Sequence, residues 1–489
     1  MKKALAIALF LTVFMLQASA LDEGKGYLYN QQGRSVPAPA GYSYTKSITG
    51  EGLAIGAFSG IADMFVSDSA LYIADTGNDR IVVLYEDYTL KKVIDTVAKN
   101  GEPQSLLQPE GVFRTPEGLL FICDTGNERI IAVDEENNII REMTKPDTEL
   151  LLQGAQYKPS KAVVNRSGSV YVVASGVYQG LVQYGNDDAF IGFFGANKVN
   201  VTAGVLISSF WKSLFTREQQ EAMIRTIPTE YSNVFIDNSG FIYTVTATAD
   251  TKQVQQLNYE GENILKYPGY DNNVLIKSLD KSNFGERDID YSKGAVIKSR
   301  MVDVQVDAEG IVSVLDSRRG RVFQYNNEAE QLCFFGGKGE QKGFFSEASA
   351  IEKCREDYLV ADAYKNSIAV FTPTQYIKNI RSALQMYTTG DYENLCDEWE
   401  KVLCDNSNFT LAYRNIGRAK LQQEDYDGAL QYLKKGDDRY YYSLALQARR
   451  SIFIRKHIIW LAPLAVLVLY LFIRVIKKVR IRLAGGAHA

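Results

Sequence analysis

Apolar and polar residues alternate in short stretches along the first three quarters of the chain, and one such stretch recurs almost unchanged. The segments LYIADTGNDRIVVL (71–84) and LFICDTGNERIIAV (120–133) match nearly position for position. Each contains an alternating apolar stretch, a turn of Asp, Gly and Asn, and a second alternating stretch that begins near an Arg. This pattern predicts two β-strands joined by a tight turn.

Four weaker copies bring the count to six. VSVLDSRRGRVFQY (312–325) and YLVADAYKNSIAVF (358–371) keep the aspartate, whereas VYVVASGVYQGLVQY (170–184) and IYTVTATADTKQVQQL (242–257) have Ala174 and Thr246 in its place. In the first copy, alternating stretches at 61–66 and 90–96 add a strand on each side. Four strands in a unit of about 45 residues are typical of a propeller blade, with a solenoid as the alternative architecture.

Closure of a ring favours the propeller. The sixth copy lacks a fourth strand, because 374–380 leads directly into helical sequence, while 42–48 is a strand-like stretch without a partner of its own. Pairing these two ends leaves no blade incomplete and no sheet edge open at the junction. The sequence therefore predicts a mainly β fold with a six-bladed β-propeller over 21–373.

The segment ADTGNDRIVVL resembles the NHL repeat family, and the resemblance covers roughly 45–372. It implies that the repeated Asp caps a turn and the repeated Arg braces neighbouring strands, so that these positions are architectural and not catalytic. The positions concerned are Asp75, Arg80, Asp124, Arg129, Asp316 and Asp362.

Two intervals between blades are long, about 195–228 and 267–300, and both join the last strand of one blade to the first strand of the next. We expect helical insertions on one face, on either side of the fourth blade; Thr216 and Gln219 form a capping box in the first. The aromatic residues there allow two interpretations: a ligand or partner site, or packing of the insertion onto the blade, which their helical spacing favours. They are Phe210, Trp211, Phe215, Tyr267 and Tyr270.

Helical spacing replaces strand alternation from Tyr376 onward. GDY (390–392) and EDY (424–426) are 34 residues apart, and AYRNIGRAKLQQEDYDGALQYL (412–433) resembles a tetratricopeptide (TPR) repeat. The resemblance implies a small α-helical TPR-like segment at 376–448 that either binds an extended peptide or acts as a stalk. Its predicted helix-packing positions are Tyr392, Ala412, Gly417, Tyr426 and Ala429.

Both ends of the chain carry targeting patterns. Two lysines, an apolar stretch and Ala18-Ser19-Ala20 predict a signal peptide at 1–20; an uncleaved N-terminal anchor is the alternative, and either would export the propeller. The apolar stretch 457–476, flanked by Arg and Lys, predicts one transmembrane helix and not a buried core helix. We expect a single-pass protein of the cell membrane, with the N-terminal ectodomain outside and a basic tail (477–489) in the cytoplasm.

Charge and composition exclude several kinds of chemistry. The formal net charge is −4, and nine positive charges lie beyond 448 and two within the signal, which leaves −15 for 21–448 and argues against nucleic-acid binding. The two histidines, His457 and His488, lie outside the ectodomain, so histidine-dependent catalysis and His-ligated metal are excluded there. Neither a metal, a cofactor nor a catalytic residue is predicted. Five scattered cysteines are interpreted as mostly buried thiols, with Cys333–Cys354 or Cys396–Cys404 left open as a disulfide.

These patterns predict a binding or scaffolding protein of a bacterial cell surface and not an enzyme. The propeller would recognise a protein or glycan ligand, and the TPR-like segment would act as adaptor to a membrane complex of transport or envelope function. The alternative is a hydrolase or lactonase that uses calcium and carboxylates on the propeller, because Asp and Glu chemistry needs no histidine.

Overall fold

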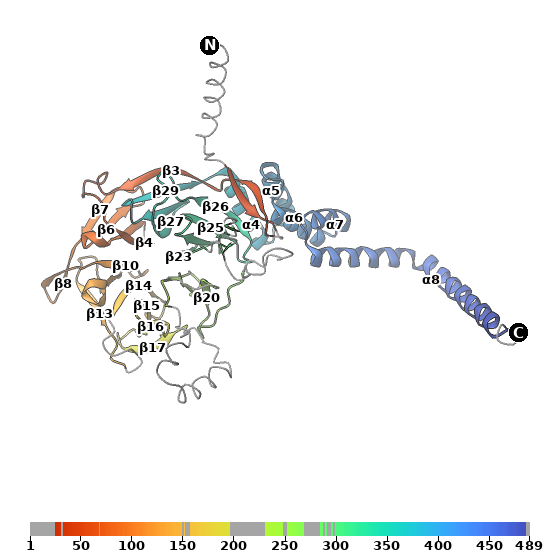
Figure 1. Cartoon of the computed structure of the whole chain (residues 1–489), viewed down its shortest axis with the longest axis horizontal. Helices are drawn as coiled ribbons and strands as arrows, with labels where there is room; N and C mark the ends of the chain where they lie inside the picture. The colour runs from red at the N-terminus through yellow and green to blue at the C-terminus, as the bar shows by residue number, and fades with distance from the viewer. Residues whose placement is uncertain are drawn as a thin grey trace, which may run out of the picture. The chain divides into compact units, whose positions relative to one another are not determined.

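The computed structural model (Figure 1) describes residues 25–485 except 31–32, 68, 149–150, 152–156, 196–229, 248–251, 268–283, 287–288, 291–294 and 297–298. Its contacts divide the chain into two compact units, Met1–Lys378 and Asn379–Ala489. Each unit is described by itself.

Six small antiparallel sheets make up most of the first unit. The first three are β4 (Ile61–Ser67), β5 (Ala70–Asp75), β6 (Arg80–Tyr85) and β7 (Leu90–Ile94); β10 (Pro109–Arg114), β11 (Leu120–Asp124), β12 (Arg129–Val133) and β13 (Ile139–Thr144); and β14 (Lys158–Val164), β15 (Val170–Ser175), β16 (Leu181–Tyr184) and β17 (Phe190–Phe194). The last three are β18 (Asn233–Ile236), β19 (Ile242–Val245) and β20 (Val254–Leu257); β23 (Met301–Val306), β24 (Val312–Asp316), β25 (Arg321–Tyr325) and β26 (Gln331–Gly336); and β27 (Ala348–Cys354), β28 (Asp357–Asp362), β29 (Ser367–Pro373) and β3 (Tyr42–Thr49).

The sheets are the blades of a closed ring. The first strand of each sheet, called here the inner strand, contacts the inner strand of the next, and β27 of the sixth blade contacts β4 of the first. The sixth blade takes its outermost strand from the other end of the domain, since β3 pairs antiparallel with β29 in a register that places Ile48 opposite Ile368. The predicted six-bladed propeller and its closing strand are confirmed.

Blade-to-blade packing explains why the middle strands are apolar along their whole length. Every residue of β5, β11 and β24 is buried, so these strands face a neighbouring sheet on both sides. The hydrophobic clusters are accordingly shared between blades: Tyr72 and Ile81 of the first blade pack with Ile122 and Ile131 of the second. Alternation alone, which predicts one buried face, understates how enclosed these strands are.

The remaining elements of the first unit are short. They are the pairs β1 (Lys25–Tyr29) with β2 (Ser35–Pro39), β8 (Thr96–Lys99) with β9 (Glu102–Ser105) and β21 (Ile289–Asp290) with β22 (Ala295–Val296), and the turns η1 (Thr76–Asn78) and η2 (Thr125–Asn127). One expectation differs here. Within the described residues the fourth blade has three strands instead of four, and the described part of the second insertion contains the β21–β22 pair. Most of that insertion, including 268–283, lies outside the described residues, so its predicted helix stays a prediction. The first insertion lies outside the described residues apart from its first residue.

The second unit is helical. Its elements are α4 (Gln375–Thr389), which begins just before the unit boundary, α5 (Tyr392–Asp405), α6 (Thr410–Gln422), α7 (Tyr426–Lys435) and α8 (Arg439–Gly485). Asp391 and Asp425 cap α5 and α7 by accepting hydrogen bonds from the backbone N–H groups of Asn394 and Gly428, which explains the recurrence of Asp-Tyr at this spacing.

One helix carries the apolar stretch near the C-terminus. The segment Arg439–Lys477 of α8 is long and apolar enough to cross a membrane, and the side chains of its most apolar stretch are exposed. The sequence separates the TPR-like segment from the predicted transmembrane helix, whereas the structure joins them, because α8 runs unbroken from Arg439 through Pro463. All five cysteines are free thiols, so neither candidate disulfide is present.

Ring closure gives a test on β3. Ile48 is buried in the cluster between the sixth and first blades, so Ile48→Ala should lower the free energy of unfolding of the propeller by about 2–4 kcal/mol. Ser43→Ala, at an exposed position of the same strand, is the control and should change it by less than about 0.5 kcal/mol. Denaturant titration followed by circular dichroism measures both free energies of unfolding. Equal changes in the two variants would show that the packing of β3 does not stabilise the closed ring.

Gly417 gives a test on the helical unit. A Cβ at this position would lie 2.5 Å from Leu433 Cγ and 3.0 Å from the Leu433 backbone nitrogen, so α6 and α7 meet too closely for a side chain. Helix propensity alone would favour Ala over Gly by about 1 kcal/mol. Gly417→Ala should nevertheless destabilise the unit by about 1–3 kcal/mol in thermal melts, and Gln422→Ala on exposed α6 surface should not. A stabilised Gly417→Ala protein would contradict this packing.

Candidate functional site

The inner strands bring equivalent residues of all six blades to the propeller axis. In five blades the pairing of the inner strand shifts by one residue near its start, as between Ile61 and Asp63 or between Met301 and Asp303. Such a bulge turns the following side chain. The pairing register places the residues that come after the bulge, and the equivalent residue of the fourth blade, at one level of the channel. We call them the channel ring: Asp63, Gly111, Lys161, Asn233, Asp303 and Ala350.

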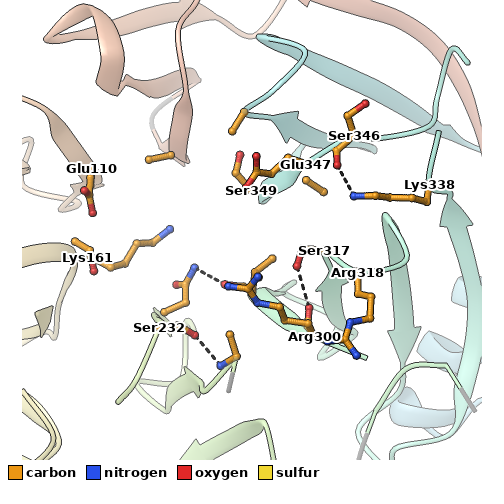
Figure 2. Close-up of a pocket in the computed structure, with 17 residues that line it drawn as sticks. Glu110, Lys161, Ser232, Arg300, Ser317, Arg318, Lys338, Ser346, Glu347 and Ser349 are labelled. Atoms are coloured by element: carbon orange, nitrogen blue, oxygen red, sulfur yellow. Dashed lines mark hydrogen bonds between the residues drawn. The ribbon is translucent and has the colours of Figure 1, made fainter. Parts of the chain in front are cut away.

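Above the channel ring lies an open cavity of about 630 Å³, called here the cup (Figure 2). Its wall comes from the starts of the inner strands and from the turns of the fifth and sixth blades. The cup is polar: it is lined by Lys161, Arg300, Arg318, Lys338, Glu110 and Glu347 and by the hydroxyl groups of Ser160, Ser232, Ser317, Ser346 and Ser349. A cavity of this size can hold a small molecule or the end of a larger one.

Below the channel ring the channel is closed. The space there is a void of only about 10 Å³, which is lined by Phe65, Phe113, Val163, Phe235 and Glu352. The rings of Phe65 and Phe113 are in contact, with centroids 4.7 Å apart. A void of this volume holds about one water molecule. The cup is therefore a dead end and not the mouth of a pore.

Four ionisable side chains are buried or largely buried at the floor of the cup. Burial raises the pKa of Asp63 and Glu352, and raises the pKa of Asp303 to about 6. Burial by itself would lower the pKa of Lys161, but the charges of Asp63 and Asp303 outweigh it and raise that pKa. Lys161 thus remains an ammonium ion and forms an ion pair with Asp63 across the channel, from the third blade to the first.

The two aspartates also join neighbouring blades. Each carboxylate accepts one hydrogen bond from its own strand and one from the inner strand of the next blade. The backbone donors are Met64 and Val112 for Asp63, and Val304 and Ile351 for Asp303, at N···O distances of 2.7 to 2.9 Å. Asn233 of the fourth blade adds a side-chain hydrogen bond to Asp303 at 2.8 Å. These carboxylates are therefore satisfied by the fold, which is what burial of a charge requires.

This arrangement bears on metal binding. Among the described residues, no group of three or more His, Cys, Asp or Glu side chains is placed to hold a metal ion. At the floor of the cup the carboxylate of Asp63 already has a cation beside it, the ammonium group of Lys161, and its oxygens accept backbone hydrogen bonds. The described residues at the floor of the cup thus do not form a calcium site.

The repeat aspartates organise turns at the ends of β5, β11, β24 and β28. Asp75 accepts hydrogen bonds from Ser59 N at 2.7 Å and from Arg80 Nε at 2.7 Å, and Asp124 is bound in the same way by Leu107 N and Arg129 Nε, both at 2.8 Å. The two later aspartates lack an arginine side-chain partner among the described residues and accept several backbone N–H groups. The donors are Arg300, Arg318 and Arg319 to Asp316, and Ser346, Glu347, Tyr364 and Lys365 to Asp362.

These turns form part of the cup wall, and the turn of the fifth blade supplies Arg318 to its lining. The turn aspartates hold the chain segments that carry Arg300, Ser346 and Glu347. The sequence identified the aspartates and missed the residues that they position.

Of the five aromatic residues predicted to wall a site, the structure describes Tyr267. Its hydroxyl donates to Val254 O at 2.8 Å and accepts from Asn263 Nδ2 at 2.8 Å, and its ring packs on Phe284. Tyr267 thus anchors the start of the second insertion to the fourth blade and does not line the cup. Phe210, Trp211, Phe215 and Tyr270 lie outside the described residues.

The predicted helix-packing positions fall on α5, α6 and α7. Ala412 and Ala429 are fully buried, Gly417 faces Leu433, and Tyr392 and Tyr426 are the first residues of α5 and α7. The backbone oxygen of Tyr392 accepts a hydrogen bond from Gln423 Nε2 at 2.8 Å, which ties α5 to the end of α6.

Comparison with known proteins adds resemblances at low identity. No protein-family model and no curated protein matches the chain. Virginiamycin B lyase from Staphylococcus aureus is 12% identical with a TM-score of 0.39, over 67% of this chain and 99% of that one. The β-propeller domain of Cps50 (Swd1) from Myceliophteria thermophila is 10% identical with a TM-score of 0.40, over 68% and 100%. A gluconolactonase from Xanthomonas campestris is 10% identical with a TM-score of 0.36, over 72% and 95%. At these values the likeness carries no argument about function.

The buried carboxyl groups predict a pH dependence. Between an ordinary carboxyl pKa near 4 and about 6, Asp303 holds its proton in the folded state and loses it in the unfolded state. The unfolded state then binds fewer protons, so raising the pH across this window lowers the free energy of unfolding, by at most about 1.4 kcal/mol per pH unit for this group.

Asp303→Asn removes that contribution, because an amide does not titrate. The loss of stability between pH 4 and pH 6 should therefore be smaller in Asp303→Asn than in the wild type, and unchanged in Glu356→Gln, which alters an exposed carboxyl group. Thermal melts at intervals of half a pH unit measure the slopes. Identical slopes in all three proteins would show that Asp303 is ionised in the folded state throughout.

Proposed function

We propose that this chain is a membrane-anchored binding protein whose propeller holds a small polar ligand, or the polar end of a larger one, in the cup. The observation that carries the proposal is the closed floor beneath a polar cavity of about 630 Å³. A dead-end cavity with charged groups and hydroxyls from several blades suits retention of a ligand, because many donors and acceptors converge on one volume.

Membrane attachment rests on α8 and on the two end patterns of the sequence. The helix contains one segment long and apolar enough to cross a membrane. The proposed orientation derives from the signal-like N-terminus and the basic C-terminal tail, which would leave the propeller outside the cell and the tail inside. The helical unit would then act as adaptor to a membrane complex, which is the role proposed for the TPR-like repeats.

The state of the charged groups disfavours hydrolysis at the floor of the cup. A carboxylate hydrolase needs a metal ion or a free acid and base at the reacting centre. At the floor of the cup, Asp63 is bound to Lys161 and to two backbone N–H groups, and Asp303 is occupied by three hydrogen bonds. These groups hold the blades together and are poorly placed to exchange protons with a substrate.

Photo-crosslinking in intact cells tests the proposal. A benzophenone amino acid at Ser232, an exposed residue of the cup wall, should give an adduct on the full-length membrane protein. The same amino acid at Ile140, which is 56% exposed on β13, is the control and should not give this adduct. Mass spectrometry of the isolated protein identifies the adduct. Equal labelling at both positions, or none at Ser232, would contradict a ligand in the cup.

A further inference from the structure

The cup is positively charged within an acidic ectodomain. Its lining contributes four cations, from Lys161, Arg300, Arg318 and Lys338, and two carboxylates, Glu110 and Glu347. The sequence from 21 to 448 carries a formal charge of −15, from a whole-chain charge of −4 and eleven positive charges outside that range. A cavity of opposite sign to its surroundings concentrates the field and attracts ligands of the surrounding sign.

The four cations are not equivalent. Lys161 is neutralised by Asp63, so it offers N–H donors at the floor without net charge. Lys338 donates to the backbone oxygen of Ser346. Arg300 differs from both, because within the described part of the chain its guanidinium group has neither an ion pair nor a hydrogen bond.

The backbone of Arg300 is nevertheless fixed on both sides. Its N–H donates to Asp316 Oδ1 at 3.1 Å, and its carbonyl oxygen accepts from the backbone N–H of Ser317 at 3.0 Å. Asp316 is a repeat aspartate, so the same turn of the fifth blade fixes the backbone position of Arg300. Figure 2 shows the side chains of Arg300 and Lys161 extending into the cavity from different walls. A guanidinium group that faces a cavity and has no counter-ion among the described residues favours a carboxylate or phosphate, which it can bind through parallel hydrogen bonds.

Charge is distributed unevenly around the cup. Arg300, Arg318 and Lys338 belong to the fifth and sixth blades together with one carboxylate, Glu347, whereas Glu110 lies on β10 of the second blade. Ser160 and Ser232 lie between these walls, on the third and fourth blades. A ligand with an anionic group at one end and hydroxyl groups along its length would match this distribution, since each part would meet a complementary partner.

We propose that the cup binds a small hydroxylated ligand through its carboxylate or phosphate group, with Arg300 as the main anion-binding residue. The inference rests on the proposed function, of which it names the ligand class. Lys161 supplies donors from the floor, and Arg318 and Lys338 supply positive charge from the same side as Arg300. Binding of the anion should weaken as ionic strength rises, because the cup is open to solvent.

Four probes of one carbon skeleton separate the possibilities: glucose, glucosamine, gluconate and glucose 6-phosphate. Calorimetric titration of the full-length protein in detergent should show binding of gluconate or glucose 6-phosphate, with little binding of the neutral and cationic sugars. The stronger of the two anions identifies whether carboxylate or phosphate is the recognised group.

Arg300→Gln should weaken anion binding at least about tenfold, since it removes a charge-assisted hydrogen-bonding group. Arg300→Lys should weaken anion binding less than Arg300→Gln does, because lysine keeps the positive charge. Arg166→Gln is the matched control: it removes the same charge from an exposed turn between β14 and β15, at the other end of the inner strand from the cup, and should leave affinity unchanged. Unchanged melting temperatures of the variants establish that the fold is intact.

The outcomes distinguish this inference from the function on which it rests. Tighter binding of glucose or glucosamine than of the anions, or equal anion binding by wild type and Arg300→Gln, overturns anion recognition and leaves ligand binding in the cup standing. Binding of none of the four probes, with a specific adduct at Ser232 in cells, also overturns anion recognition alone. Absence of both binding and adduct overturns the two proposals together.

Discussion

The pairing of β3 with β29 is the constraint on which the rest of the first unit depends. A row of six blades without this pairing would expose the edge of the last sheet, and nothing would hold the first and last inner strands beside each other. Once the ring is closed, β27 contacts β4 and all six inner strands face one axis. Only then do residues as distant in sequence as Asp63, Lys161 and Asp303 meet at one level of a channel.

Closure also decides the electrostatics of that channel. Asp63 and Asp303 accept hydrogen bonds from backbone N–H groups at two blade junctions. They can do so only if the cost of burying two carboxylates is offset. A single buried ammonium group, that of Lys161, compensates them. Because one positive charge is shared among several carboxyl groups, burial holds the remaining carboxyl pKa values high, as the value of about 6 for Asp303 shows. The hydrogen bonds that join the blades and the polarity of the cup floor thus come from the same buried aspartates.

The sequence predicted the ring well and the site poorly, and both outcomes have a physical reason. Six copies of a strand–turn–strand pattern are local features, and the unpaired stretch 42–48 indicated how they close. The residues of the cup depend on a bulge and on strand register, which no local pattern specifies. The spacing from the channel ring to the turn is 12 residues from Asp63 to Asp75 but 13 from Asp303 to Asp316. A charged residue within an apolar strand, as in IADMF and MVDVQ, was the available signal. It marks a buried charge without indicating what the charge faces.

The C-terminal unit shows how a short repeat array can be completed by an element of another kind. A short array of helix pairs such as α4 to α7 leaves an apolar helix face uncovered at its end, and a further pair is normally needed to cover it. Here the first turns of α8 supply that cover: Ala445 is fully buried, and Tyr441 and Leu446 pack against the cluster formed by α7. The same helix then continues into the apolar segment. About 13 residues separate Ala445 from Ile458, which corresponds to about 20 Å of helix. Because no loop intervenes, the apolar segment is continuous with the helical turns that pack on α7.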